Sequence, residues 1–195
     1  ADLQVLRDKL GSVGVPAPSL HTRVVDARGR DCAAGTPGEL LLRGPNLGTR
    51  YWEDPAATTP LVDANGWFAT GDVVRCDEDG FFWVVDRKKD MFISGGENVY
   101  PAEIEAALAD YPGIAECAVV GLPDPQWGES GHLLIVPAHG DLQVEAILAF
   151  LGERLARYKL PRHVRCVAAL PRTATGKLQK ARLKDLAGTA RRRRT

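Results

Sequence analysis

Alternating apolar and polar residues in the first half of the chain predict short antiparallel strands. Residues 22–26 alternate in this way, and residues 38–44 form an apolar run bounded by glycines. An acidic turn at residues 77–80 lies between two further apolar segments, which is typical of a β-hairpin. We therefore expect residues 12–86 to form a small antiparallel sheet or a β-barrel-like unit.

The hydrophobic pattern changes after residues 86–90, where five consecutive charged residues require the chain to reach the surface. Pro101 then fits the first position of a helix, and apolar residues from Val144 to Leu155 recur on one helical face. Further strands are expected at 116–122, 132–136 and 164–167, and a last helix at 179–186. This pattern predicts a compact α+β domain with a short sheet and flanking helices.

These changes in pattern divide the chain into four predicted segments. A β subdomain covers residues 1–86, and a hinge lies within residues 87–90. An α+β domain follows at 91–187, and a basic tail completes the chain at 188–195. The boundary is placed at the charged run because buried strands cannot continue through it.

Charge and composition argue against several classes of protein. The 195 residues include 25 basic and 25 acidic ones, but four of the basic residues form the run at 191–194. The remaining acidic body argues against nucleic-acid binding, and we interpret the run as a solvated chain end. No transmembrane segment or signal peptide is expected, which favours a cytoplasmic protein. Because residue 1 is Ala, we expect a piece of a longer chain.

The cysteines and histidines are scattered along the chain. Cys32, Cys76, Cys117 and Cys166 lie more than 40 residues apart, so no pair has the spacing of a metal or redox motif. The histidines are equally dispersed. We therefore expect reduced thiols that act as small packing residues, and no metal site.

Three short segments place polar residues where packing does not require them. Asp72 ends a Thr-Gly-Asp turn, and its carboxylate can accept two hydrogen bonds from a vicinal diol such as ribose. The paired glycines of residues 94–98 allow another molecule to approach the backbone closely. Taken alone, each of these two segments also fits an ordinary turn.

The third segment is a polar loop at residues 170–178 that carries Lys177 just before a helix. A lysine on a flexible loop can reach into a distant site and bind phosphate or carboxylate oxygens. The glycine spacing of a Walker phosphate loop is absent, which excludes that motif. The alternative for an isolated segment of this kind is a solvated lysine.

Four segments, taken together and in this order, resemble the adenylate-forming superfamily of acyl-CoA synthetases, aryl-CoA ligases, luciferases and peptide-synthetase adenylation domains. They are residues 67–72, 86–105, 158–161 and 171–177. The segment 86–105 resembles fatty-acyl-CoA and aryl-CoA ligases rather than peptide synthetases. The resemblance runs from residue 11 to residue 186 and implies that residues 91–187 form the mobile C-terminal lid domain of such an enzyme.

The resemblance also implies roles for individual residues in the large domain and hinge. Asp72 matches the acidic residue that binds the ribose hydroxyls of ATP. Arg87 matches an arginine that contacts the ribose and phosphates, and Lys89 falls on the hinge residue about which the lid domain rotates.

In the lid domain, Ser94, Gly95 and Gly96 match the loop that lines the pantetheine channel for CoA. Lys177 matches the lysine that bridges the substrate carboxylate and the α-phosphate during adenylation. Mg²⁺ is implied as well, with its ligands mostly outside this chain.

The sequence departs from the family pattern in two ways. The phosphate loop, the Tyr-Gly-x-Thr-Glu segment and the acyl pocket are absent, so we expect the N-terminal large domain to be missing and the chain alone to be inactive. Leu160 stands where some relatives place an arginine for the CoA phosphates, and either Lys159 or Arg162 could substitute for it. Tyr158 either stacks on adenine or packs beside Pro161.

The sequence therefore favours the C-terminal part of an AMP-forming acyl-CoA ligase for a fatty or aryl carboxylic acid, which would use ATP and CoA. One alternative is an adenylation enzyme that loads a carrier protein. A second alternative is a non-catalytic interaction module descended from such an enzyme.

Overall fold

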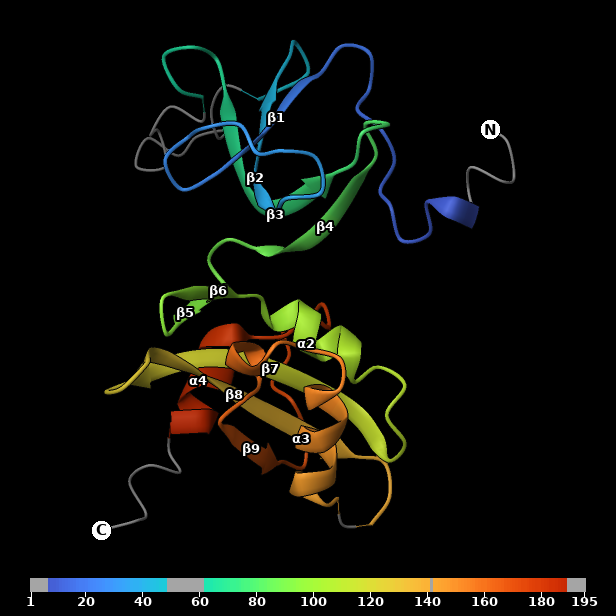
Figure 1. The fold of residues 1–195 in the computed structure, drawn as a ribbon, viewed down its shortest axis with the longest axis vertical. Helices are drawn as coiled ribbons and strands as arrows, with labels where there is room; N and C mark the ends of the chain where they lie inside the picture. The colour runs from blue at the N-terminus through green and yellow to red at the C-terminus, as the bar shows by residue number, and fades with distance from the viewer. Residues whose placement is uncertain (1–6, 49–61, 141, 189–195) are drawn as a thin grey trace. The chain divides into compact units, whose positions relative to one another are not determined.

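The computed structural model describes residues 7–48, 62–140 and 142–188 (Figure 1). The chain divides into two compact units, Ala1–Lys88 and Lys89–Thr195. Each unit contains its own sheet, and helices accompany the second sheet, so the fold is a mixed α+β fold. None of the helices in the described part of the chain is long and apolar enough to span a membrane.

The first unit contains a four-stranded antiparallel sheet in the order β1-β2-β3-β4. The strands are β1 (His21–Val25), β2 (Gly38–Arg43), β3 (Phe68–Cys76) and β4 (Phe82–Arg87). Among the described residues the two edge strands, β1 and β4, do not pair with each other. The unit is therefore an open sheet, and the barrel-like closure expected from the sequence is wrong for this part of the chain.

The expected hairpin is present as β3 and β4, and acidic side chains shape its turn. Asp77 Oδ1 accepts hydrogen bonds from the backbone N–H groups of Asp79 and Phe81, at 3.0 and 2.9 Å. The Lys9 ammonium lies 2.6 Å from a carboxylate oxygen of each aspartate. Its hydrogen bond to Asp77 lowers the pKa of that carboxyl from its ordinary value. The turn therefore closes around charge-assisted hydrogen bonds.

The second unit contains a five-stranded sheet in which β8 is central. Its order is β6-β5-β8-β7, and β9 pairs with β8 in parallel. The strands are β5 (Phe92–Ser94), β6 (Glu97–Val99), β7 (Ile114–Asp124), β8 (Gly128–Pro137) and β9 (His163–Cys166). The helices are α2 (Pro101–Ala107), α3 (Val144–Gly152), α4 (Lys180–Gly188) and the 3₁₀ turn η1 (Arg157–Lys159).

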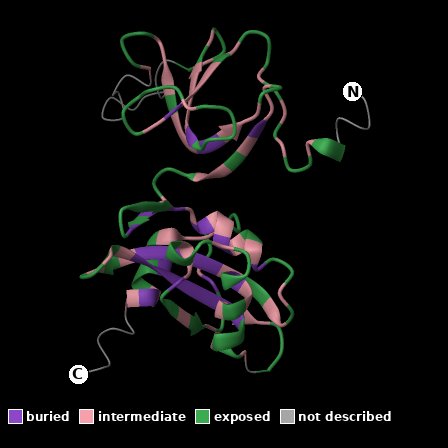
Figure 2. Ribbon diagram, in the orientation of Figure 1, coloured by how far each residue is buried: buried purple, intermediate pink, exposed green. Residues whose placement is uncertain are grey.

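Both faces of the β7–β8 pair are buried (Figure 2). Successive residues of a strand point to opposite faces, so Leu133 and Ile135 join one cluster with α2 and α3. Leu134 joins the other cluster, which contains Leu183 of α4. This double coverage explains why the middle of β8 is a continuous apolar run rather than an alternating one.

Two expected elements have different lengths in the structure. The β7–β8 hairpin continues beyond the apolar runs as far as the pair Asp124 and Gly128, because Asp124 Oδ1 accepts hydrogen bonds from the next backbone N–H groups of the turn. Helix α3 ends at Gly152, although the apolar periodicity extends to Leu155. Leu155 still packs against the α2–α3 cluster. The apolar periodicity at this position therefore indicates a buried side chain and not a helical backbone.

Gly121 of β7 offers a direct test of this packing. A Cβ at this position would clash with Phe92 Cβ, whereas a Cβ at Gly152 would meet only Leu160 Cδ1 at 3.9 Å. We expect Gly121→Ala to lower the free energy of unfolding by about 1–3 kcal/mol through overpacking. Urea denaturation followed by circular dichroism measures the change.

Gly152→Ala is the matched control, because it adds the same methyl group at a helix end that has room for it. We expect this variant to be neutral or slightly more stable. Equal stability of the two variants would contradict the packing described for the sheet.

Candidate functional site

Asp72 and Arg87 meet across the β3–β4 hairpin of the first unit. They are register partners, and Arg87 Nε lies 2.7 Å from Asp72 Oδ1. The arginine side chain is 60% exposed and the aspartate side chain 28% exposed, so this ion pair contributes little to stability. Within the described residues, Asp72 Oδ2 has no hydrogen-bond partner and can accept hydrogen bonds from a ligand.

The backbone around Asp72 is held by its neighbours. The Thr70 hydroxyl accepts a hydrogen bond from the Asp72 N–H at 3.0 Å and donates to the Leu40 carbonyl at 2.9 Å. Gly71 has a φ of 72°, which favours glycine, and its carbonyl accepts from the Lys88 N–H at 2.8 Å. These contacts fix the turn that presents the carboxylate.

The two lysines at the boundary between the units differ in their contacts. The Lys88 ammonium lies 2.6 Å from Glu39 Oε2 and so belongs to the first unit. Lys89 is exposed and is the first residue of the second unit. Within the described residues the Lys89 side chain has no hydrogen-bond or ion-pair partner, which is compatible with a hinge position.

Gly95 and Gly96 form the two-residue turn between β5 and β6. Their φ angles are 61° and 88°, as tight hairpin turns require. The Gly95 N–H donates to the Trp127 carbonyl at 2.9 Å, and a Cβ at Gly95 would lie 3.1 Å from the indole ring. Ser94 is buried and pairs with Gly128 of β8. The turn thus presents bare backbone, and the strand geometry alone already requires the glycines.

Lys177 ends a closed, hydrogen-bonded loop rather than the flexible loop expected from its composition. The Thr173 N–H donates to the Lys177 carbonyl at 2.8 Å, and the Lys177 N–H donates to Thr173 Oγ1 at 3.1 Å. Gly176 has a φ of 82° within this loop. In the part of the chain that the structure describes, the exposed Lys177 ammonium has no hydrogen-bond or ion-pair partner.

The Gly95–Gly96 turn and the Lys177 loop lie near opposite ends of β7. The turn contacts Trp127 beside Asp124, whereas Arg172 of the loop binds Glu116 at 2.6 Å. At about 3.4 Å per residue, the eight steps from Glu116 to Asp124 span roughly 27 Å. The structure therefore does not bring these predicted site residues together within the second unit.

The segment around Leu160 distinguishes two candidate cations. The Lys159 ammonium donates to both carboxylate oxygens of Glu103, at 2.6 and 2.8 Å, and is committed to holding η1 on α2. Arg162 is exposed, and its guanidinium lies 4.1 Å from the centre of the Trp127 ring. Tyr158 is 41% exposed. Of the two cations, Arg162 is the one that is available to an anion.

Several contacts were missed by the sequence analysis. The Arg172–Glu116 and Lys159–Glu103 ion pairs each join residues 56 positions apart, and no local spacing signals such pairs. His132 and His163 stack at 4.2 Å between ring centroids, as register partners of β8 and β9. Only a correct strand pairing would have revealed that contact.

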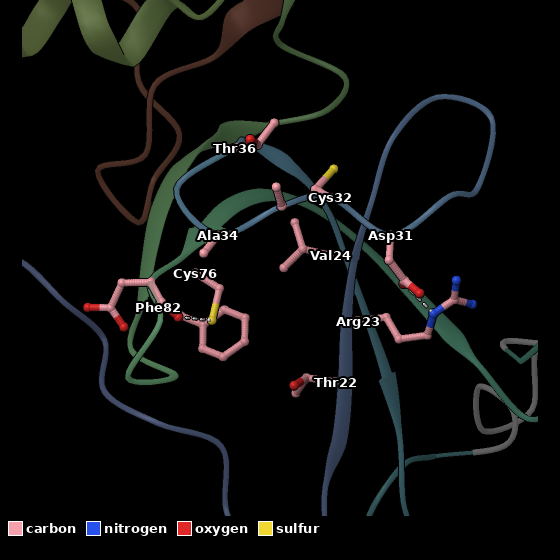
Figure 3. A pocket seen from close by; sticks show the side chains of 11 residues that line it. Thr22, Arg23, Val24, Asp31, Cys32, Ala34, Thr36, Cys76 and Phe82 are labelled. Carbon is pink, nitrogen blue, oxygen red and sulfur yellow. Dashed lines mark hydrogen bonds and ion pairs between the residues drawn. The ribbon is translucent and has the colours of Figure 1, made fainter.

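A pocket of about 400 Å³ in the first unit contains none of the predicted site residues (Figure 3). Its lining includes Cys32, Cys76 and the ion pair of Arg23 Nε with Asp31 Oδ1 at 2.7 Å. Burial is the main cause that raises the pKa of both thiols, which makes them poor nucleophiles. Among the described residues, no group of three or more His, Cys, Asp or Glu could hold a metal ion.

Comparisons with known families match most of the described chain. Residues 103–177 match the AMP-binding enzyme C-terminal domain, and residues 2–52 match the AMP-binding enzyme model. A feruloyl-CoA synthase from Amycolatopsis sp is 46% identical over 178 residues, which are 91% of this chain and 36% of that protein. An indoleacetate–CoA ligase from Aromatoleum aromaticum is 47% identical, over 91% of this chain and 35% of the ligase.

The solved structures that resemble this chain include CoA synthetases and a CoA ligase. An o-succinylbenzoate CoA synthetase from Bacillus subtilis, in complex with its acyl-adenylate intermediate, superposes with a TM-score of 0.83 and 37% identity. That match covers 93% of this chain and 37% of the synthetase. The chain thus spans about a third of the length of the relatives it matches.

The reactivity of the cysteine thiols tests the burial of Cys117 in the second unit. Burial, with a smaller contribution from the Glu105 carboxylate, raises the pKa of the Cys117 thiol to about 11. Because the thiolate is the nucleophile, we expect iodoacetamide at pH 8 to modify Cys117 at least about tenfold more slowly than the exposed Cys166. A mass-spectrometric time course of the two peptides measures both rates.

The raised pKa of Cys117 also determines how the stability of the fold changes with pH. An unfolded thiol has a pKa of about 8.5, so the contribution of Cys117 to stability is complete below that pH. It is lost as the pH rises toward about 11, because the unfolded state then releases the proton first. Equal alkylation rates for Cys117 and Cys166 would show that Cys117 is not buried.

Proposed function

Since the chain belongs to the family of AMP-binding enzymes, we propose that it forms the C-terminal part of an AMP-forming acyl-CoA ligase. In the first half-reaction, a fatty or aryl carboxylate attacks the α-phosphate of ATP to give acyl-AMP and pyrophosphate. In the second, the CoA thiol displaces AMP to give the thioester. The N-terminal two thirds of the relatives would supply the acyl pocket, so we propose that this chain alone is inactive.

The exposed Lys177 ammonium is the observation that carries this proposal. The first half-reaction brings two anions together, and a cation between them stabilises the transition state more than the separated reactants. Lys159 and Lys180, by contrast, are paired with Glu103 and Glu105. The loop around Lys177 is held by hydrogen bonds while its ammonium stays available.

Asp72 and Arg87 suit the nucleotide in the same reaction. The carboxylate can accept hydrogen bonds from both ribose hydroxyls, while Arg87 holds its other oxygen at 2.7 Å and offers further donors toward phosphate. No cluster of metal ligands occurs among the described residues. We propose that the metal accompanying ATP is held outside this chain.

The second half-reaction would use the backbone of Ser94, Gly95 and Gly96 to line the path of the pantetheine arm. The points at which the turn and the Lys177 loop meet the β7–β8 hairpin, beside Asp124 and at Glu116, lie roughly 27 Å apart, so we propose that the unit presents them to the cleft in two different orientations. Rotation about Lys89 would exchange them between the two half-reactions. We place the boundary of this rotating domain within residues 87–90.

Free CoA is the proposed thiol, rather than the pantetheine arm of a carrier protein. The exposed Arg162 guanidinium on Trp127 offers a cation for the nucleotide phosphates of CoA, and Lys159 does not. The relatives named above are likewise CoA ligases. The four free cysteines favour a reducing compartment, and we propose a cytoplasmic location.

Lys177→Ala tests the adenylation role in a chimera that joins this chain to the remainder of the Amycolatopsis feruloyl-CoA synthase. Loss of a transition-state charge partner should lower ATP–pyrophosphate exchange by about 10²–10³-fold. Thioester formation from supplied feruloyl-AMP and CoA should stay within twofold of the unsubstituted chimera. The control is Lys184→Ala, which removes an exposed lysine of α4. Equal loss of both half-reactions would refute the assignment.

Lys89→Pro tests the rotation in the same chimera. Proline fixes φ, so we expect one orientation to persist and thioester formation to fall at least about tenfold while adenylation continues. Lys89→Ala removes the charge but leaves φ free, and it should retain both half-reactions. Normal thioester formation in the proline variant would mean that no rotation occurs at this residue.

A further inference from the structure

Arg172 connects the Lys177 loop to the sheet through both ends of its guanidinium. Nη1 donates to the Gly176 carbonyl at 2.7 Å, and Nη2 lies 2.6 Å from Glu116 Oε2 on β7. The planar guanidinium holds these two donors in a fixed relation. The carbonyl just before Lys177 is therefore anchored to a strand of the sheet.

The peptide bond between Gly176 and Lys177 is held from both sides. Arg172 binds its carbonyl at 2.7 Å, and Thr173 Oγ1 accepts from its N–H at 3.1 Å. Since the peptide unit is planar, two contacts on its opposite edges fix the plane and the direction in which Lys177 leaves the backbone. Thr173 belongs to the loop, so Arg172 is the contact that relates this plane to the sheet.

The base of the loop is also closed through Arg172. Its backbone pairs with Leu178, and its carbonyl accepts from Gln179 Nε2 at 2.8 Å. The Gln179 N–H donates to the Pro171 carbonyl at 2.9 Å. These contacts do not depend on the Arg172 side chain, so the base of the loop keeps its pairing when the guanidinium is removed, while the segment at Gly176 loses its anchor.

Stability alone does not explain the Arg172 contacts. The arginine and Glu116 side chains are each 44% exposed, and ion pairs at such exposure contribute little to folding. A lysine could form the same ion pair but lacks the second donor in a fixed plane. This geometry bears on the orientation of the neighbouring Lys177, whose ammonium has no partner of its own among the described residues.

We propose that Arg172 is a positioning residue for adenylation, which orients the Lys177 ammonium by clamping the Gly176 carbonyl to Glu116. This inference rests on the proposed function of Lys177. A displacement of about 1 Å at a reacting centre can cost up to about 10²-fold in rate. The loss should fall on the half-reaction that uses Lys177 and spare the one that does not.

The experiment compares Arg172→Gln, Arg172→Lys and Arg182→Gln in the feruloyl-CoA synthase chimera. We expect Arg172→Gln to lower kcat for ATP–pyrophosphate exchange about 10- to 100-fold, with KM for ATP and the thioester half-reaction within twofold. Arg172→Lys should recover only part of this loss. Arg182→Gln removes an exposed arginine of the adjacent α4 and should change neither half-reaction.

Three results would overturn the inference. If Arg172→Gln slows both half-reactions equally, the residue supports only the fold. If it slows neither while Lys177→Ala abolishes adenylation, Lys177 needs no clamp and only this inference fails. If Lys177→Ala itself leaves adenylation intact, the proposed function of the lysine fails, and the inference fails with it.

Proteolysis of the 195-residue chain tests the clamp without catalysis. Endoproteinase Lys-C cuts after lysine, and we expect Arg172→Gln to raise the initial rate of cleavage after Lys177 at least about threefold, because local opening of the loop becomes easier. Glu116→Gln should act in the same direction. An unchanged cleavage rate in both variants would refute the clamp.

Discussion

The antiparallel pairing of β7 with β8 positions Trp127, which contacts the Gly95 turn, and Glu116, which anchors the Lys177 loop. The pair runs from Ile114 with Pro137 to Asp124 with Gly128, and its middle is covered by apolar clusters on both faces. One end carries the Trp127 turn that contacts Gly95, and the other end carries Glu116. A shift of register by one residue would exchange the buried faces and displace both contacts together.

Some cationic side chains of the second unit form ion pairs with carboxylates, whereas others are exposed without one. The lysines at 159 and 180 are paired with glutamates of α2, and their side chains are partly buried. Lys177 and Arg162 are exposed, and neither has a carboxylate partner among the described residues. Available cations in a nearly neutral protein are the groups that an anionic substrate can recruit.

Local patterns predicted the elements of the fold better than their lengths and pairings. The acidic turn identified the β3–β4 hairpin, and Pro101 identified the start of α2, because both signals lie within a few residues. The barrel-like closure expected for the first sheet was wrong, and the apolar periodicity ran past the end of α3, since both features depend on what packs against the element. The motif residues could be placed in order, but the Arg172–Glu116 pair joins segments that only the tertiary fold brings together.

The contact between Gly95 and Trp127 restricts how this protein can diverge. A Cβ at position 95 would lie 3.1 Å from the indole, so the ring would have to shift slightly, and the φ of 61° disfavours a side chain there as well. A smaller residue at 127 would also take away the surface on which Arg162 stacks. Substitutions at these three positions, which are distant in the sequence, are therefore coupled through the tryptophan.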